Sequence, residues 1–320
     1  MRSLPRLAWP AACLAALAGG AYLGGAMSPP GASPAPWCAD FWPPEEDLAT
    51  LASWRRFPSA PGERLVYAVR WGVVTVGEAV SETLPMETFI PLWETLGRQE
   101  PEYGYVTLQE ESTAPRPALT WPRGVYRIRA TARTRAWVPY KVRNEIESWI
   151  DAEGTFPWRF FKSQREGGSL KEEHIEIDHR DGTAYYYKKR PAESDAHLRR
   201  VVRTIEPLAQ DCVSVLYFLR LSALDPGTAR NIRVHTDGQS WDTMVHVVGE
   251  ERLRTPAGTF DCLVVKPVFR YEGLFTRESE PTVWIEKRTH IVVQMEVKVT
   301  IGHIRTYLTS ASGVPAWEGR

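Results

Sequence analysis

Cys212 is the residue whose type and position come nearest to a recognisable catalytic chemistry. It opens a segment, residues 212–219, in which apolar side chains recur at the spacing of one helix face. A thiol at a helix N-terminus can be nucleophilic, because the positive end of the helix dipole lowers its pKa. However, Cys212 shares the apolar face with Val215 and Leu216, and no partner histidine is specified near it. We therefore favour a buried cysteine that packs as a small hydrophobic side chain.

A run of alternating polar residues is the second candidate, a cation site. His174, Glu176 and Asp178 would lie on one face of an extended strand, whereas His179 would lie on the other. The two isoleucines between them are predicted core residues. We favour an ordinary solvated strand face over a metal site, because the apparent pair of histidines is not a pair.

The other polar residues fit no known constellation. Phosphate-binding glycine loops, nucleophile elbows and metalloprotease helices are absent, and 39 acidic residues offer many carboxylate pairs without singling one out. The isolated histidines that match no ligand spacing are His235, His246, His290 and His303. The sequence thus designates no catalytic residue, no metal ligand and no cofactor, and the ligand-binding residues stay unknown.

The composition is that of a folded protein without a strong overall field. Among 320 residues, 43% are hydrophobic and 13 are tryptophan, which excludes a disordered chain. Lys plus Arg and Asp plus Glu number 39 each, so the net charge is zero. We expect no nucleic-acid partner and no global attraction to an anionic membrane.

The N-terminus is typical of an export signal. Two arginines precede an apolar stretch at residues 7–27, and Gly24 and Ala26 suit the −3 and −1 positions of a cleavage site. Residues 1–26 are therefore predicted to be a signal peptide. An uncleaved anchor is the alternative, because about 20 apolar residues can span a bilayer. Either way we expect an exported protein, periplasmic or anchored in the inner membrane.

Cleavage would leave three cysteines, Cys38, Cys212 and Cys262, in an oxidising compartment. This odd number permits at most one internal disulfide, and a Cys212–Cys262 pair is compatible with the sequence but depends on geometry that the sequence does not fix. The cysteines are too scattered to predict a zinc site.

Alternation of apolar and polar residues predicts an all-β, mainly antiparallel protein of about a dozen strands. The clearest expected strands are 65–71, 73–76, 125–135, 142–150, 158–166, 170–179, 183–189, 231–235, 242–248, 259–266, 291–301 and one ending near 308. One packed helix is expected near 208–222. Such a set favours a large curved sheet, a barrel or a two-sheet sandwich.

The domain organisation follows from these elements. A Pro/Trp-rich linker at residues 27–60, with a short helix near 45–54, precedes a single β domain at 61–312 and a tail at 313–320. A Pro-rich excursion at 85–122, which includes a candidate strand at 103–108, interrupts the domain. It is either a cap over a cavity mouth or a surface insertion, and we favour the insertion.

Charged residues alternate on two of the expected strands. Arginines on 127–135 would face glutamates on 141–147 if the two strands were neighbours. We favour an ordinary solvated face over an anion-binding stripe, because the glutamates would neutralise the arginines.

Several short runs resemble a bacterial exported family, domain of unknown function 3108. They are residues 62–67, 71–72, 77–79, 143–149, 210–220, 255–262, 284–285 and 302–304. The resemblance covers about residues 61–310, its most specific part is Pro-Ala-Gly-Thr-Phe-Asp-Cys at 256–262, and the 85–122 excursion is longer than the family usually carries. It implies an all-β envelope protein and carries over no catalytic residue.

Export, amphipathic strands and an apolar helix together favour a non-catalytic cell-envelope protein whose sheet surrounds an apolar groove. Its expected partner is a lipid or other amphiphilic ligand. The alternatives are an envelope structural or interaction protein with a protein partner, and less favoured, a hydrolase acting on an envelope polymer.

Overall fold

The computed structural model describes residues 57–92, 119–188, 199–236, 239–269, 281–298 and 302–315. These residues form fourteen strands and the helix α4, Ser214–Leu221. The strands are β1 Arg64–Trp71, β2 Val74–Thr88, β3 Gly124–Thr134, β4 Val142–Asp151, β5 Pro157–Glu166, β6 Ser169–Asp178, β7 Thr183–Lys188, β8 Arg199–Thr204, β9 Ala229–Thr236, β10 Gln239–Thr255, β11 Gly258–Phe269, β12 Thr282–Glu286, β13 Val292–Lys298 and β14 His303–Ser312. No helix among the described residues has the length and apolar character needed to cross a membrane.

All the strands belong to one curved antiparallel sheet, so the protein is all-β as predicted. The strand order is β8-β7-β6-β5-β4-β3-β2-β1-β14-β13-β12-β11-β10-β9. Alternation in the sequence becomes alternation of burial, as in β13, where Val293, Met295 and Val297 are buried and the residues between them are partly exposed. The two-sheet sandwich is excluded, because one continuous ladder joins every strand.

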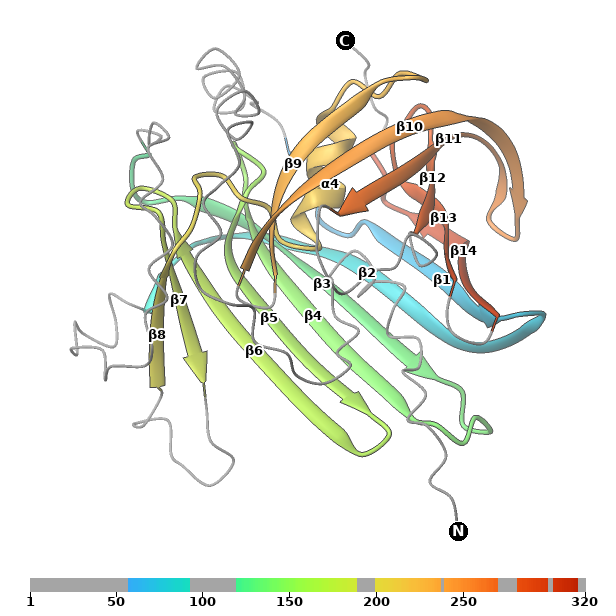
Figure 1. The fold of residues 1–320 in the computed structure, drawn as a ribbon, viewed down its shortest axis with the longest axis horizontal. Coiled ribbons are helices and arrows are strands. Elements are labelled where there is room, and N and C mark those ends of the chain that lie inside the picture. The colour runs from blue at the N-terminus through green and yellow to red at the C-terminus, as the bar shows by residue number, and fades with distance from the viewer. Residues whose placement is uncertain are drawn as a thin grey trace, which may run out of the picture.

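The sheet curls around α4, and β9, β10 and β11 arch over the helix (Figure 1). Gln210, on the segment that leaves β8, pairs with the other edge: its N–H donates to the Arg233 carbonyl at 2.8 Å, and the His235 N–H donates to its carbonyl at 2.7 Å. Tyr186 on β7 also hydrogen-bonds His235 on β9. These contacts bring the two edges together and enclose the concave face.

The helix is shorter than the predicted span 208–222. Leu208 has a positive φ of 58°, and Gln210 pairs with β9 instead of continuing a helix. The helix begins where the Asp211 carboxylate accepts hydrogen bonds from the N–H groups of Val213 and Ser214, each at 2.7 Å. Because of this tertiary pairing, the helix starts at Ser214, six residues after the predicted start at 208, and Cys212 precedes it.

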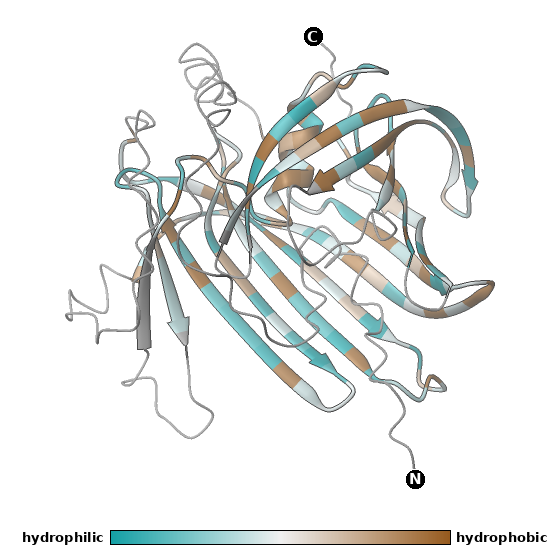
Figure 2. Ribbon diagram, viewed as in Figure 1, coloured by the Kyte–Doolittle hydropathy of each residue, from teal (hydrophilic) through white to brown (hydrophobic). Residues whose placement is uncertain are grey.

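α4 packs between two halves of the sheet. Val213 and Tyr217 join a buried cluster built mainly from β3 to β7, whereas Val215 and Leu219 join a cluster from β9 to β13. Figure 2 shows the helix as an apolar element within the curve. Each large apolar side chain buried in this way stabilises the fold by about 1.5–3 kcal/mol.

Four strands differ from the predictions. β2 and β10 are longer than expected, since β2 continues to Thr88 and β10 spans Gln239–Thr255, and β8 and β12 were not predicted. The described start of the excursion covers the convex face: Leu92 N–H donates to Glu176 at 2.8 Å, and Arg159 donates to the Ile90 carbonyl at 2.8 Å. The candidate strand at 103–108 and the helix at 45–54 lie outside the described residues.

Candidate functional site

The thiols are not placed for chemistry. Cys212 is 2% exposed within the main core cluster and Cys262 is 1% exposed. They are not joined, so the Cys212–Cys262 disulfide that the sequence left open is not formed. Burial raises the pKa of Cys262 to about 12, which keeps that thiol protonated. Cys38 lies outside the described residues.

The three polar residues of β6 share a face but do not form a metal site. Glu176 binds the Arg159 guanidinium, Asp178 binds Arg180 at 2.9 Å, and the His174 ring contacts the Tyr187 ring. The described residues contain no group of three metal-ligating side chains. The prediction of a solvated face is also wrong for Glu176 and Asp178, which are buried. Leu92 from the excursion contributes to the burial of Glu176.

The four isolated histidines stay apart. His235 is buried at the joined sheet edges, and His290 is buried against the backbone of Leu219 and Arg220 in α4. His246 is half-buried and His303 is exposed. His290 is the one that lines a cavity.

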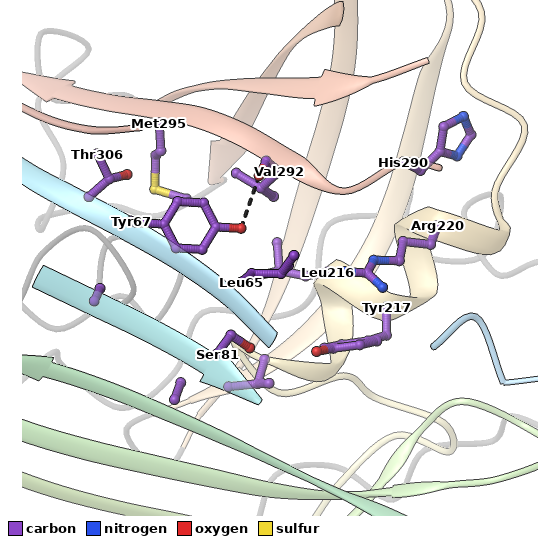
Figure 3. A pocket seen from close by; sticks show the side chains of 13 residues that line it. Leu65, Tyr67, Ser81, Leu216, Tyr217, Arg220, His290, Val292, Met295 and Thr306 are labelled. Atoms are coloured by element: carbon purple, nitrogen blue, oxygen red, sulfur yellow. Dashed lines mark hydrogen bonds between the residues drawn. The ribbon is translucent and has the colours of Figure 1, made fainter. Parts of the chain in front are cut away.

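This cavity lies on the concave side, between α4 and the strands β1, β2, β13 and β14 (Figure 3). The centre of a water molecule can occupy about 40 Å³ of it. Its walls are mostly apolar, and the residues that form them are Leu65, Tyr67, Ala79, Ser81, Ala130, Val213, Leu216, Tyr217, Arg220, His290, Val292, Met295 and Thr306.

A buried ion pair borders the cavity. Arg220 Nη1 lies 2.9 Å from Glu63 Oε2, and the two side chains are 5% and 1% exposed. The guanidinium also lies over the Tyr217 ring, 4.6 Å from its centroid. Burial opposes the charge of Arg220, but the adjacent Glu63 carboxylate outweighs it and raises the pKa of Arg220. The site therefore contains a cation that is already neutralised.

The tyrosine hydroxyls in the wall are engaged as well. Tyr67 donates to the Val292 carbonyl at 2.9 Å, and Tyr217 hydrogen-bonds Ser81 and Thr83. Burial raises the pKa of both tyrosines, so both stay protonated. The free wall surface is accordingly apolar in character, and a ligand would bind it by contact area.

A second, smaller cavity lies on the opposite side of α4, with about 20 Å³ open to the centre of a water molecule. Its lining is almost wholly aliphatic, from Val215 and Leu219 on the helix to Val245 and Ile285 on the sheet. Leu216 lines both cavities. Cavities lined in this way stay dry, because a water molecule there lacks polar partners. The helix thus sits in apolar space that it does not fill.

The family described as a protein of unknown function, DUF3108, matches residues 110–309. The chain belongs to this family. The match confirms the resemblance seen in the sequence. No curated protein has a matching sequence.

Solved structures similar to this DUF3108 protein are distant. A beta-barrel-like protein of family DUF1849 from Brucella abortus is 11% identical, with 80% of this chain and 99% of that chain covered and a TM-score of 0.47. A candidate lipoprotein from Parabacteroides distasonis is 12% identical, with 80% and 97% covered and a TM-score of 0.32. A candidate exported protein with a YmcC-like fold from Bacteroides fragilis is 11% identical, with 80% and 98% covered and a TM-score of 0.28. These likenesses carry no conclusion about function.

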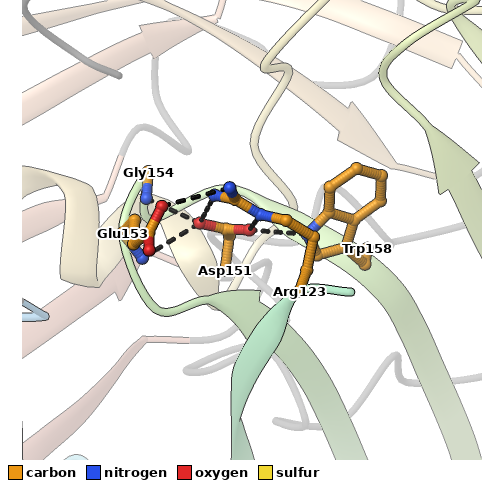
Figure 4. A network of polar contacts seen from close by, with 5 residues as sticks. All are labelled: Arg123, Asp151, Glu153, Gly154 and Trp158. Atoms are coloured by element: carbon orange, nitrogen blue, oxygen red, sulfur yellow. Dashed lines mark hydrogen bonds and ion pairs between the residues drawn. The ribbon is translucent and has the colours of Figure 1, made fainter. Parts of the chain in front are cut away.

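A second buried network in the DUF3108 protein is structural (Figure 4). Asp151 is fully buried and accepts two hydrogen bonds from Arg123, at 2.7 and 2.6 Å, and one from Trp158 at 2.8 Å. Backbone N–H groups of Glu153 and Gly154 complete its shell. Every lone pair of the carboxylate has a donor, so the network fixes the β4–β5 connection and leaves no site for a substrate.

The residues around the cavity were not predicted from the sequence to form a site. Glu63 and Tyr67 come from β1 and its approach, whereas Tyr217 and Arg220 come from the helix about 150 residues later. One local signal was available: Arg220 follows Leu216 by four residues and so falls on the apolar face of the helix. A charged residue on such a face indicates a buried partner.

Proposed function

We propose that this DUF3108 protein is an exported, non-catalytic cell-envelope protein that binds an apolar chain of a lipid or other amphiphile inside its curved sheet. The observation that supports it is the unfilled apolar space on both sides of α4. The export signal predicted at residues 1–26 supports the envelope location, periplasmic or anchored through that segment.

The size of the cavities limits the ligand. About 40 Å³ of open space accommodates the end of one chain and not a complete two-chain lipid. A larger part of the ligand would enter only if α4 moved away from the sheet. Leu216, which separates the two cavities, is the side chain that such a movement would displace first.

The chemistry of the interior favours binding over catalysis. The Glu63 carboxylate is tied to Arg220, and the Asp211 carboxylate accepts hydrogen bonds from Ser148 and two backbone N–H groups. Neither lies in a cleft open to a polymer, and Cys212 is buried. A hydrolase acting on an envelope polymer therefore has no supporting observation among the described residues.

Native mass spectrometry of the protein purified from its own cells tests the proposal. We expect a bound amphiphile that denaturation releases. Ala130→Leu would fill the cavity wall and lower the bound fraction at least several-fold, whereas Ala68→Leu makes the same change on the opposite face of the sheet and would leave it unchanged. Two results together would refute ligand binding. Mass spectra of the parent and both variants would show only the bare polypeptide, and treatment that removes lipid would leave the thermal unfolding of the parent unchanged.

A further inference from the structure

Three turns and the neighbouring ends of two strands form one continuous rim of the sheet. The turns connect β1 to β2, β3 to β4 and β5 to β6, and the strand ends are those of β13 and β14 at Lys298 and His303 (Figure 1). Gly72 N–H donates to the His303 carbonyl at 3.1 Å, Arg135 N–H to the Val76 carbonyl at 2.9 Å, and Gly167 N–H to the Lys141 carbonyl at 2.9 Å. Each of the three turns is thus hydrogen-bonded to a neighbouring strand or turn, and we call these turns together with the ends of β13 and β14 the basic rim.

The basic rim exposes large apolar side chains. Val73 is 90% exposed, Val74 47%, Trp137 58% and Leu170 51%. They are four of the seven large hydrophobic residues that are exposed in the described part of the chain. Figure 2 shows the tip of the β1–β2 hairpin as an apolar projection. Such a concentration at one edge is typical of an interaction surface.

The same turns are strongly cationic. The segments 70–75, 133–143, 165–172 and 298–305 contain nine basic residues and two acidic ones. The basic residues, all exposed, are Arg70, Arg133, Arg135, Lys141, Arg143, Arg165, Lys171, Lys298 and Arg305. Two of them form ion pairs with glutamates just outside these segments, Arg133 with Glu78 and Arg305 with Glu296. Although the net charge of the chain is zero, the rim therefore has a local excess of five positive charges.

Arginines stand directly opposite one another on the rim. Arg143 on β4 is paired in register with Arg133 on β3 and with Arg165 on β5. Arg70 on β1 is likewise opposite Arg305 on β14. Like charges in these positions destabilise a sheet. Their presence indicates a surface that meets an anionic partner.

Farther from the rim the same face of the sheet is neutral. Arg129 lies opposite Glu82 on one side and Glu147 on the other, and Glu82 pairs with Arg64 at 2.8 Å. The expected pairing of arginines with glutamates is therefore present in the middle of the sheet. At the rim this pairing holds for Arg133 with Glu78 and for Arg305 with Glu296. It fails at Arg143, whose two partners in register are both arginines.

We propose that the basic rim docks on the surface of an anionic phospholipid bilayer. Each Lys or Arg near such a surface contributes about 1 kcal/mol, and exposed Trp, Leu and Val side chains insert at the headgroup boundary. The loop that carries Trp137 is fixed by two hydrogen bonds, because Lys141 Nζ donates to the carbonyls of Ala136 and Val138 at 2.5 and 2.7 Å. Charge and apolar side chains occur together on this edge, as interfacial binding requires.

A fluorescent reporter tests the docking directly. With Cys13 and Cys38 replaced by serine, Val73→Cys in the full chain would carry an environment-sensitive dye, and Val248→Cys, another exposed valine, would be the control. When the labelled protein is mixed with vesicles that contain phosphatidylglycerol, we expect the dye emission to shift to the blue at position 73 and to stay unchanged at position 248. The shift should disappear at high salt and be weak with phosphatidylcholine alone. An unchanged dye at position 73 would overturn the proposal.

Two matched double variants distinguish the effect of the charges on the rim from the effect of the overall charge of the protein. The double variant Arg143→Gln and Arg165→Gln should bind anionic vesicles about thirty-fold more weakly, from about 1 kcal/mol for each basic residue. Arg64→Gln with Arg129→Gln makes the same charge change in the middle of the sheet and should bind like the parent. The rim variant should unfold at an equal or higher temperature, since it removes like-charge repulsion. Equal binding by both variants, or binding of nucleic acid in preference to vesicles, would contradict bilayer docking.

Discussion

Breaking the Glu63–Arg220 ion pair should be among the most costly single changes in the protein. The two side chains are 1% and 5% exposed, and their charged atoms are 2.9 Å apart. At an effective dielectric constant of about 20, opposite charges about 4 Å apart attract by about 4 kcal/mol. Removing one of two buried partners leaves the other uncompensated, and costs about 3–5 kcal/mol. That is a large part of a total stability of about 5–15 kcal/mol.

Urea unfolding followed by circular dichroism would measure the effect. Glu63→Gln and Arg220→Met should each lower the free energy of unfolding by about 3–5 kcal/mol. The double variant should cost less than either single variant, because it leaves no buried charge behind. The exposed pair Arg64–Glu82, 2.8 Å apart, is the matched control, and its single variants should cost at most about 1 kcal/mol.

Additivity would refute this reasoning. If the double variant lost the sum of the two single losses, the charges would not compensate each other, and the stabilisation would come from separate contacts of each side chain. One such contact exists, the Arg220 hydrogen bond to the Pro58 carbonyl at 3.3 Å. A loss below about 1 kcal/mol for both single variants would show instead that water reaches the pair.

Three further predictions concern stability. The pKa of His179 is lowered to about 4 by burial, so its stabilising contribution is complete above pH 6.5 and falls by about 3 kcal/mol as the pH drops towards 4. His179→Gln should flatten this fall in urea midpoints measured between pH 7.5 and 4. Gly77→Ala should cost about 1–3 kcal/mol in thermal unfolding, since a Cβ there would lie 2.6 Å from a backbone oxygen of β3, whereas Gly249→Ala, with nothing within 4 Å, should be neutral. Asp151→Asn should lower the free energy of unfolding in urea by about 3–5 kcal/mol, because its arginine partner is only 11% exposed; a loss below 1 kcal/mol would contradict the role assigned to the network.

Most strands could be predicted because their signal is local. In β13 and β4 one face is buried along most of the strand, and the sequence alternates accordingly. β12 has only five residues, too few for periodicity to separate it from a loop. The helix start depends on Gln210 pairing with β9, a contact between segments more than 20 residues apart, and no local pattern records it.

The cavity and the basic rim could not be predicted from the sequence, for different reasons. The cavity depends on how β1 and α4 meet, and Glu63 and Arg220 are 157 residues apart in the chain. The rim depends on register: the arginines of β3, β4 and β5 form a row only because Arg143 pairs with Arg133 and Arg165. A one-residue change of register would have moved these side chains to the other face of the sheet.

The buried cluster between the rim and the cavity relates the two proposals physically. Leu65, Tyr67 and Ala79 belong to the cavity wall, and the same apolar cluster continues through Val76 to Val138 in the β3–β4 loop of the rim. A continuous cluster of buried apolar side chains therefore runs from the edge proposed to meet the bilayer to the space proposed to bind a chain. Val76 and Val138 are 2% and 0% exposed, so packed side chains close this route. An apolar chain taking this route would have to displace Val76 or Val138, and Val138 lies next to Trp137, the exposed side chain proposed to enter the bilayer.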